Sequence, residues 1–144
     1  MLSDIKIVTA TDYSSGVADV NGAAVSVSGY EGVIAVVKAA AVATGAVTSV
    51  ELQCSDTAAF TAAYAITGGS ISVAADDDNQ IFAIEVMRPP YPYVRVVINK
   101  DATNAVAESS LYILFGPGYK PQANTVADKM TTVSLYQPAA TLIE

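Results

Sequence analysis

The residues able to carry chemistry are few, because the chain of 144 residues contains no histidine and a single cysteine, Cys54. Histidine is the commonest general base and a frequent metal ligand. One chain therefore cannot supply a Ser-His-Asp or Cys-His site. Ser3 and Lys6 match the Ser-x-x-Lys spacing of serine acyl-enzymes, but β-branched residues follow where that motif requires a helix, and its partner motifs are missing. The sequence predicts a protein without catalytic residues or cofactors, with Lys6 exposed on a first strand.

Three consecutive carboxylates, Asp76 to Asp78, are possible oxygen ligands for calcium. An EF-hand loop needs glycine at its sixth position and a bidentate glutamate at its twelfth, and no starting point within this run meets either condition. Neighbouring residues of an extended chain point to opposite sides, so the three carboxylates converge only if the loop curls. A solvated turn is the favoured interpretation, and calcium binding stays open as the alternative.

Cys54 lies between Gln53 and Ser55, with neither a histidine nor an adjacent basic residue to lower its pKa. We interpret it as a small buried apolar residue. A reactive thiol or an intermolecular disulfide is the less favoured alternative.

Strands are predicted throughout the chain, because short runs of alternating apolar and polar residues recur at intervals of about ten residues, separated by turn-forming residues. This spacing is typical of a β-sandwich or barrel. The predicted strands lie at Ile5–Ile7, Val25–Val27, Val33–Val37, Val50–Cys54, Phe60–Ile66, Ile81–Val86, Tyr93–Asn99 and Ser110–Phe115. Asn21-Gly22 and Gly68-Gly69 are predicted turns. Ala39 to Ala46 is rich in alanine, but its glycine, threonine and valines favour a loop or a strand extension over a helix.

The composition predicts association with a partner. Of the residues, 52% are hydrophobic and 15% charged, and the mean hydropathy is +0.41. This is more apolar surface than a single domain of this size easily buries. No membrane segment is expected, because residues 32–50 are interrupted by Lys38 and other polar residues, and the N-terminus lacks the pattern of a secretory signal. The net charge of −7, without any basic cluster, argues against nucleic-acid binding.

Two residues near the Tyr93 strand are candidates for contact with a partner. Tyr91 lies in Pro-Pro-Tyr-Pro, which cannot form an inner strand, so we expect an edge or loop that presents Tyr91 outward. Arg95 lies between two valines and shares a face with Tyr93. Its guanidinium is expected to pair with a carboxylate such as Glu51 or Glu85, and an ion pair between subunits is the alternative.

Several of these segments resemble a family of small proteins encoded beside the major capsid gene of tailed bacteriophages. The matching residues are Asn21–Val37, the V-x-L-Q-x-S-D strand end formed by Val50, Leu52, Gln53, Ser55 and Asp56, the strand Tyr93–Ile98, and the closing segment Gly116–Pro121. The resemblance spans residues 16–121. It implies a structural virion protein that decorates and cements the outer surface of the capsid, made in the host cytoplasm and bound to the major capsid protein.

The sequence and the resemblance together predict one antiparallel, jelly-roll-like β-sandwich over residues 1–121, with an extended C-terminal arm over residues 122–144. A homotrimer is favoured and a dimer is the alternative. The expected interface residues are Tyr91, Tyr93, Arg95, Tyr119, Leu135 and Tyr136. A head fibre base, a neck component, or a β-sandwich module that binds carbohydrate or a cell surface remain alternative functions, because this fold hosts many activities.

Overall fold

A computed structural model of the chain describes residues 4–44, 48–74, 77–100 and 106–118. These residues form nine strands and no α-helix, and no helix among them is long and apolar enough to cross a membrane. The strands are β1 (Ile5–Gly16), β2 (Val20–Asn21), β3 (Val25–Ser26), β4 (Gly32–Val42), β5 (Thr48–Ser55), β6 (Tyr64–Val73), β7 (Ile81–Met87), β8 (Tyr93–Asn99) and β9 (Val106–Phe115). The prediction of an all-β fold is confirmed.

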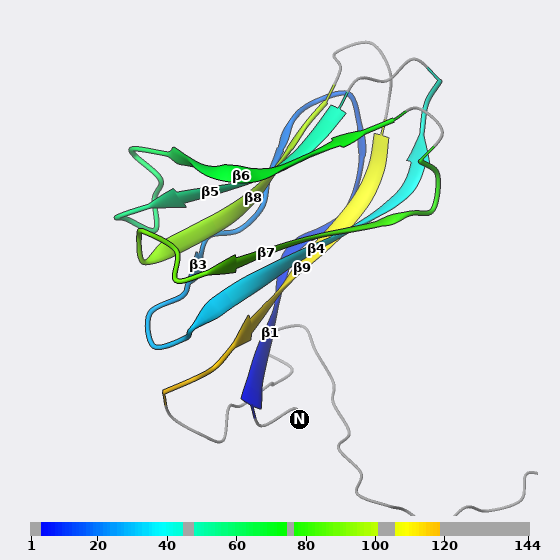
Figure 1. Cartoon of the computed structure of the whole chain (residues 1–144). Helices are drawn as coiled ribbons and strands as arrows, with labels where there is room; N and C mark the ends of the chain where they lie inside the picture. Colours follow the sequence, from blue (N-terminus) through cyan, green and yellow to red (C-terminus); the bar gives the residue numbers. More distant parts are fainter. Residues whose placement is uncertain (1–3, 45–47, 75–76, 101–105, 119–144) are drawn as a thin grey trace, which may run out of the picture.

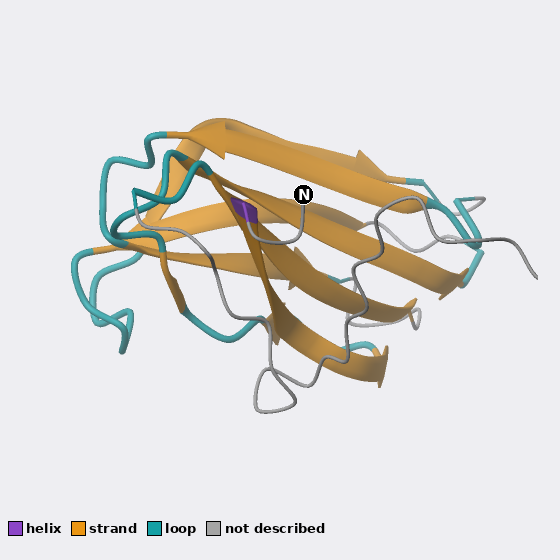
Figure 2. Cartoon of the chain, turned by 90° about the horizontal axis from the view of Figure 1, so that it is seen from below, coloured by secondary structure: helices purple, strands orange, loops and turns teal. Residues whose placement is uncertain are grey.

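The strands form two antiparallel sheets that pack face to face (Figure 1, Figure 2). One sheet has the order β1-β9-β4-β7, and the other has the order β2-β8-β5-β6, with β3 also paired to β8. The chain changes sheet at nearly every connection, and among the described strands only β5 and β6 are consecutive hydrogen-bonded neighbours. This order is that of a jelly roll. The predicted jelly-roll-like sandwich is therefore confirmed.

The core lies between the two sheets and is lined by alternate residues of the strands. Val33, Ala35 and Val37 of β4 point inward and are at most 2% exposed. Val94 and Val96 of β8 contribute from the other sheet and are fully buried. Because these side chains are small and mostly β-branched, they suit close packing of one strand surface against another.

The predicted Asn21-Gly22 turn is not a turn. β2 ends at Asn21 and β3 begins at Val25, and both strands pair with β8. Gly22 therefore interrupts one edge strand without reversing the chain. A Cβ atom at this position would lie 2.8 Å from Val96 Cγ1, so glycine lets the chain approach β8 closely.

The predicted Gly68-Gly69 turn is also wrong, because both glycines lie inside β6. In the pairing of β6 with β5, Ala65 lies opposite Gln53 and Ser70 lies opposite Glu51. The β6 segment between these pairs is longer than the β5 segment, so β6 forms a bulge there. Gly68 has a φ of 77°, a conformation that glycine adopts without steric cost.

The predicted strand Phe60–Ile66 is correct only in its second half, since β6 begins at Tyr64 and Phe60 lies in the preceding loop with a φ of 51°. The alanine-rich segment after Val37 proves to be a strand extension as far as Val42. Tyr119, Leu135 and Tyr136, with the whole expected arm over residues 122–144, lie outside the described residues.

Candidate functional site

The outer side of the β1-β9-β4-β7 sheet is apolar, although it points away from the core. The strand register places its outward side chains in four cross-strand rows. The first row holds Ile5, Phe115, Gly32 and Met87; the second Ile7, Ile113, Ile34 and Glu85; the third Thr9, Leu111, Val36 and Ala83; and the fourth Ser109, Lys38 and Ile81. We call this surface the apolar face. None of its members belongs to the core cluster, and Ile81 and Met87 are 66% and 54% exposed.

The apolar face arises from strands that lack alternation. β4 runs without a polar side chain from Val33 to Val37, and β9 does so from Leu111 to Phe115 apart from the tyrosine at 112. Continuous apolar strands are typical of sheets that are covered on both sides. The sequence thus carries a signal for this surface, because a wholly apolar strand such as Val33–Val37 presents apolar side chains on both of its sides.

Two charged side chains lie in the rows of the apolar face, and a third, Asp12 of β1, lines a surface pocket together with Lys38 at its border. Glu85 of β7 is in the second row and Lys38 of β4 is in the fourth, so they lie on either side of the row that contains Val36 and Ala83. The Lys38 ammonium donates a hydrogen bond to the carbonyl oxygen of Asn79. The carboxylate of Glu85 forms no hydrogen bond or ion pair with the residues that the structure describes.

The outer side of the second sheet is polar. Its outward residues include Ser49, Glu51 and Gln53 of β5, Ser70 and Ser72 of β6, and Tyr93, Arg95 and Asn99 of β8. The two outer surfaces of the sandwich therefore differ in chemistry, and only the polar one is suited to water.

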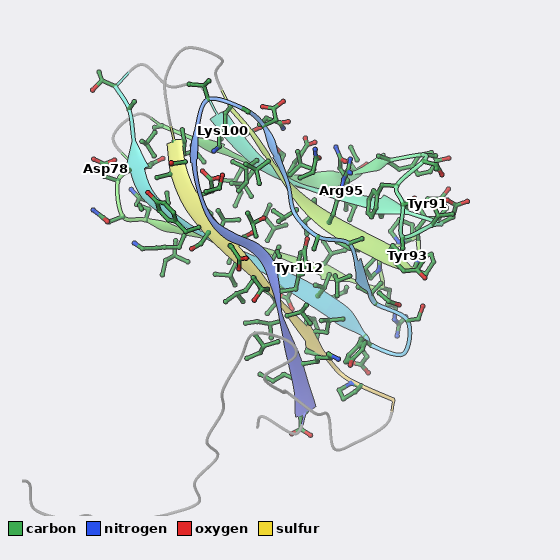
Figure 3. The ribbon with its side chains drawn as sticks, turned by 180° about the vertical axis from the view of Figure 1, so that it is seen from behind. Asp78, Tyr91, Tyr93, Arg95, Lys100 and Tyr112 are labelled. Atoms are coloured by element: carbon green, nitrogen blue, oxygen red, sulfur yellow. The ribbon has the colours of Figure 1, made fainter. Side chains whose placement is uncertain are left out.

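Arg95 projects onto this polar side together with Tyr93, as predicted (Figure 3). Its Nε and Nη2 atoms donate to Gln53 Oε1 at 3.0 and 2.8 Å, and Gln53 Nε2 donates to Glu51 Oε1 at 2.7 Å. The guanidinium carbon also lies 4.5 Å from the centre of the Phe60 ring. The expected direct pairing with Glu51 or Glu85 is therefore corrected, because Gln53 stands between Arg95 and Glu51. An ion pair of Arg95 with another subunit stays a prediction.

Tyr91 lies in the loop between β7 and β8, as predicted, but it is not simply presented outward. It packs partly against the core, and its ring stacks on that of Tyr64 with centroids 4.9 Å apart. Tyr64 is 47% exposed, so the stacked pair still has one open side. The roles of Tyr91 and Tyr93 in an interface stay predictions.

A buried ion pair joins the two sheets at one end of the sandwich. Lys100 Nζ lies 2.8 Å from both carboxylate oxygens of Glu108, with hydrogen-bond geometry to Oε1, and it also donates to the carbonyl oxygen of Val106 at 3.0 Å. Both side chains are 1% exposed. Burial raises the pKa of Glu108, while the hydrogen bond and charge of Lys100 and a hydrogen bond with Ser14 oppose that rise. Nothing in the sequence spacing indicated this pair.

Tyr112 occupies the centre of the core (Figure 3). Its hydroxyl donates to the Ala23 carbonyl at 2.9 Å and accepts from the Val96 amide at 2.8 Å. The interruption at Gly22 leaves no strand beside that amide, so Tyr112 supplies the missing partner from the opposite sheet. Burial raises the pKa of the Tyr112 hydroxyl far above its ordinary value. The hydroxyl therefore keeps its proton, and its role is to hold the structure together.

The acidic turn forms hydrogen bonds within the chain. Asp77 accepts from the Ala74 amide and from Gln80 Nε2, and Asp78 accepts from the Val42 amide, each at 2.7 Å. Asp76 lies outside the described residues. Among the residues that are described, no group of three or more metal-ligating side chains is arranged to hold an ion. The turn interpretation accounts for Asp77 and Asp78.

Cys54 is 1% exposed, and burial raises its pKa. Its thiol donates to the Tyr64 carbonyl at 3.6 Å. This confirms the interpretation of Cys54 as a small buried residue.

Models of known protein families give no match to this sequence, and neither do the curated proteins. The functional argument therefore depends on the chain's own surfaces, of which the apolar face is the most distinctive.

Proposed function

We propose that this protein is a structural component of a tailed-bacteriophage head that decorates the outer surface of the capsid shell and binds the major capsid protein. The observation that carries the proposal is the apolar face. A sheet surface in which isoleucine, leucine, valine and phenylalanine fill adjacent rows is a protein interaction site by its chemistry. The resemblance of Val50–Asp56 and Tyr93–Ile98 to the capsid-associated family supports the shell as the partner.

The rest of the molecule fits a passive mechanical role. A two-layer sandwich with a continuous core is a rigid spacer, and many weak contacts repeated by symmetry supply strong attachment without any single tight site. The net charge of −7 opposes nonspecific aggregation of the protein before assembly. On this proposal the protein contributes buried area that opposes the pressure of packaged DNA.

The test uses phage heads that lack this protein because its gene has been deleted. Purified protein added to such heads is expected to cosediment until a fixed copy number is reached, and to raise the temperature at which the heads rupture. Absence of binding to the heads contradicts the proposal. Binding confined to one vertex, seen by electron microscopy, contradicts decoration in favour of a neck or fibre-base role, and binding to glycans without binding to heads contradicts it in favour of a carbohydrate-binding module.

A further inference from the structure

We infer that the apolar face is the contact between two copies of this chain, related by a twofold axis that runs along its third row, through Val36 and Ala83. The inference rests on the assembly role proposed above, which needs the face to be covered by protein. It adds that a second copy of the chain covers the face and that a twofold axis relates the two copies. The dimer would therefore meet the capsid shell through its remaining surface.

The two charges on the face point to a second copy. A twofold axis along the third row exchanges the second and fourth rows, so the row of Glu85 in one copy lies over the row of Lys38 in the other. Each copy then sets Lys38 against the partner's Glu85, and the pair occurs twice in the dimer. β4 and β7 are neighbouring strands about 4.8 Å apart, a lateral offset that both long side chains span.

The same geometry explains why opposite charges occur on a surface whose other side chains are mostly apolar. Burying an isolated carboxylate against apolar side chains is costly, whereas a paired one is tolerated. If the face packed against an unrelated apolar surface, Glu85 would lose water without gaining a cation. Self-pairing satisfies both charges with a single surface patch, as an isologous contact requires.

The size of the face is sufficient for such a contact. Four strands about 4.8 Å apart and four rows about 6.8 Å apart cover roughly 500 Å² on each copy. The two copies together therefore bury about 1,000 Å², the lower limit for a specific interface. Two aligned sheets pack about 10 Å apart, with their side chains interleaved, as they do inside a sandwich. A face of this size predicts a dimer that dissociates on dilution.

Charge reversal tests the pairing. Lys38→Glu places two carboxylates against each other at both pairs, and Glu85→Lys does the same with two ammonium groups, so each single variant is expected to weaken association at least about tenfold. The double variant Lys38→Glu/Glu85→Lys restores opposite charges and is expected to recover the dimer. Light scattering across a dilution series measures the dissociation constant of the full-length protein.

The variants control for net charge and for folding. Lys38→Glu changes the net charge from −7 to −9 and Glu85→Lys changes it from −7 to −5, so repulsion between whole molecules would move the two in opposite directions. Recovery in the double variant shows that neither substitution acts by unfolding the chain. Ser72→Glu, exposed on the polar side, adds one negative charge and is expected to leave the dissociation constant unchanged.

Loss of association in both single variants with recovery in the double variant supports the inference. A double variant that stays dissociated contradicts the twofold pairing, as does a dimer that neither single variant weakens. A monomeric wild-type protein that still binds phage heads overturns the inference and leaves the proposed function standing. A dimer with the predicted charge dependence that does not bind heads overturns the proposed function alone.

Discussion

At the residue scale, the Lys100–Glu108 pair stabilises the fold only while both members are present. Each side chain is 1% exposed, so neither charge has water as an alternative partner. Removing one partner of a buried pair typically costs about 3–5 kcal/mol, whereas replacing both with apolar residues is often neutral.

We therefore expect Lys100→Met to lower the free energy of unfolding by about 3–5 kcal/mol at pH 8. The loss is expected to become smaller as the pH falls, because Glu108, whose pKa burial already raises, takes up a proton and no longer leaves a buried charge. The double variant Lys100→Met/Glu108→Leu is expected to regain most of the stability. Urea denaturation followed by circular dichroism measures all three. Equal losses for the single and double variants would contradict the pairing argument.

Glu108 also predicts a pH dependence with a definite sign. Its pKa in the folded protein is raised above its ordinary value of 4.5, so as the pH rises the unfolded chain releases this proton first. The folded state then binds more protons than the unfolded state, and the contribution of Glu108 to stability, complete below pH 4.5, is lost as the pH rises through the folded pKa. Subtracting the unfolding curve of Glu108→Gln from that of the wild type isolates this decline. A difference that rises with pH in this window would show that the shift has the opposite sign.

Tyr112→Phe is expected to lower the free energy of unfolding by about 1–3 kcal/mol, because the buried Val96 amide loses its acceptor. Tyr13→Phe is the matched control, since Tyr13 is 70% exposed and loses only a solvated hydroxyl. Thermal unfolding measures both. Similar melting temperatures for the two variants would indicate that the hydroxyl of Tyr112 has no structural role.

At the element scale, the strands that follow simple alternation were predictable from the sequence. β8 was predicted with its observed bounds, and β7 within one residue. The failures occur where a glycine serves a close approach or a bulge. Gly22 and Gly68 carry the same local signal as a hairpin turn, but contacts with β8 and β5 decide the outcome, and those contacts are far away in the sequence.

The candidate site was predictable only in part. The position of Arg95 beside Tyr93 follows from strand alternation, whereas its contact with Gln53 depends on the register between β5 and β8. The apolar face likewise required knowing that the apolar strands β4 and β9 are neighbours. The meeting of Lys100 with Glu108 depends on the packing of one sheet on the other, which no local pattern encodes.

The interruption between β2 and β3 gives a prediction for Gly22. In Gly22→Ala the new methyl group would lie 2.8 Å from Val96 Cγ1 and 3.1 Å from the Tyr112 hydroxyl oxygen, and both atoms belong to the packed core. We expect a loss of about 1–3 kcal/mol in the free energy of unfolding, the usual cost of overpacking. Gly118→Ala, whose methyl group would meet its nearest atom at 3.7 Å, is the control. Unfolding in urea compares them, and a neutral Gly22→Ala would contradict the close-approach argument.

At the scale of the whole molecule, the sandwich has one outer surface suited to water and one suited to protein. The inward residues of the two sheets form the apolar core. Further apolar side chains, beyond those that the core contains, lie on the outer side of β4 and β9. An apolar outer surface of this kind is expected of a subunit that associates with other protein, as proposed above.

Two alanine substitutions separate these surfaces. Ala83 lies in the third row of the apolar face, and Ala65 lies on the polar side beside Gln53; both are exposed, so lysine at either position fits the folded monomer. Ala83→Lys places an ammonium group beside the twofold axis, against the same group of the partner. Ala65→Lys adds the same charge on the opposite sheet, outside the twofold contact inferred for the apolar face.

The most direct test is the solution mass of the full-length protein and these two variants, measured by light scattering at matched concentrations up to the highest at which the protein stays soluble. The account predicts that the wild type and Ala65→Lys have about twice the chain mass of 14.8 kDa, and that Ala83→Lys has the mass of a single chain. A wild type that stays at the single-chain mass, or an Ala83→Lys variant that associates as the wild type does, would contradict the claim that the apolar face joins two copies.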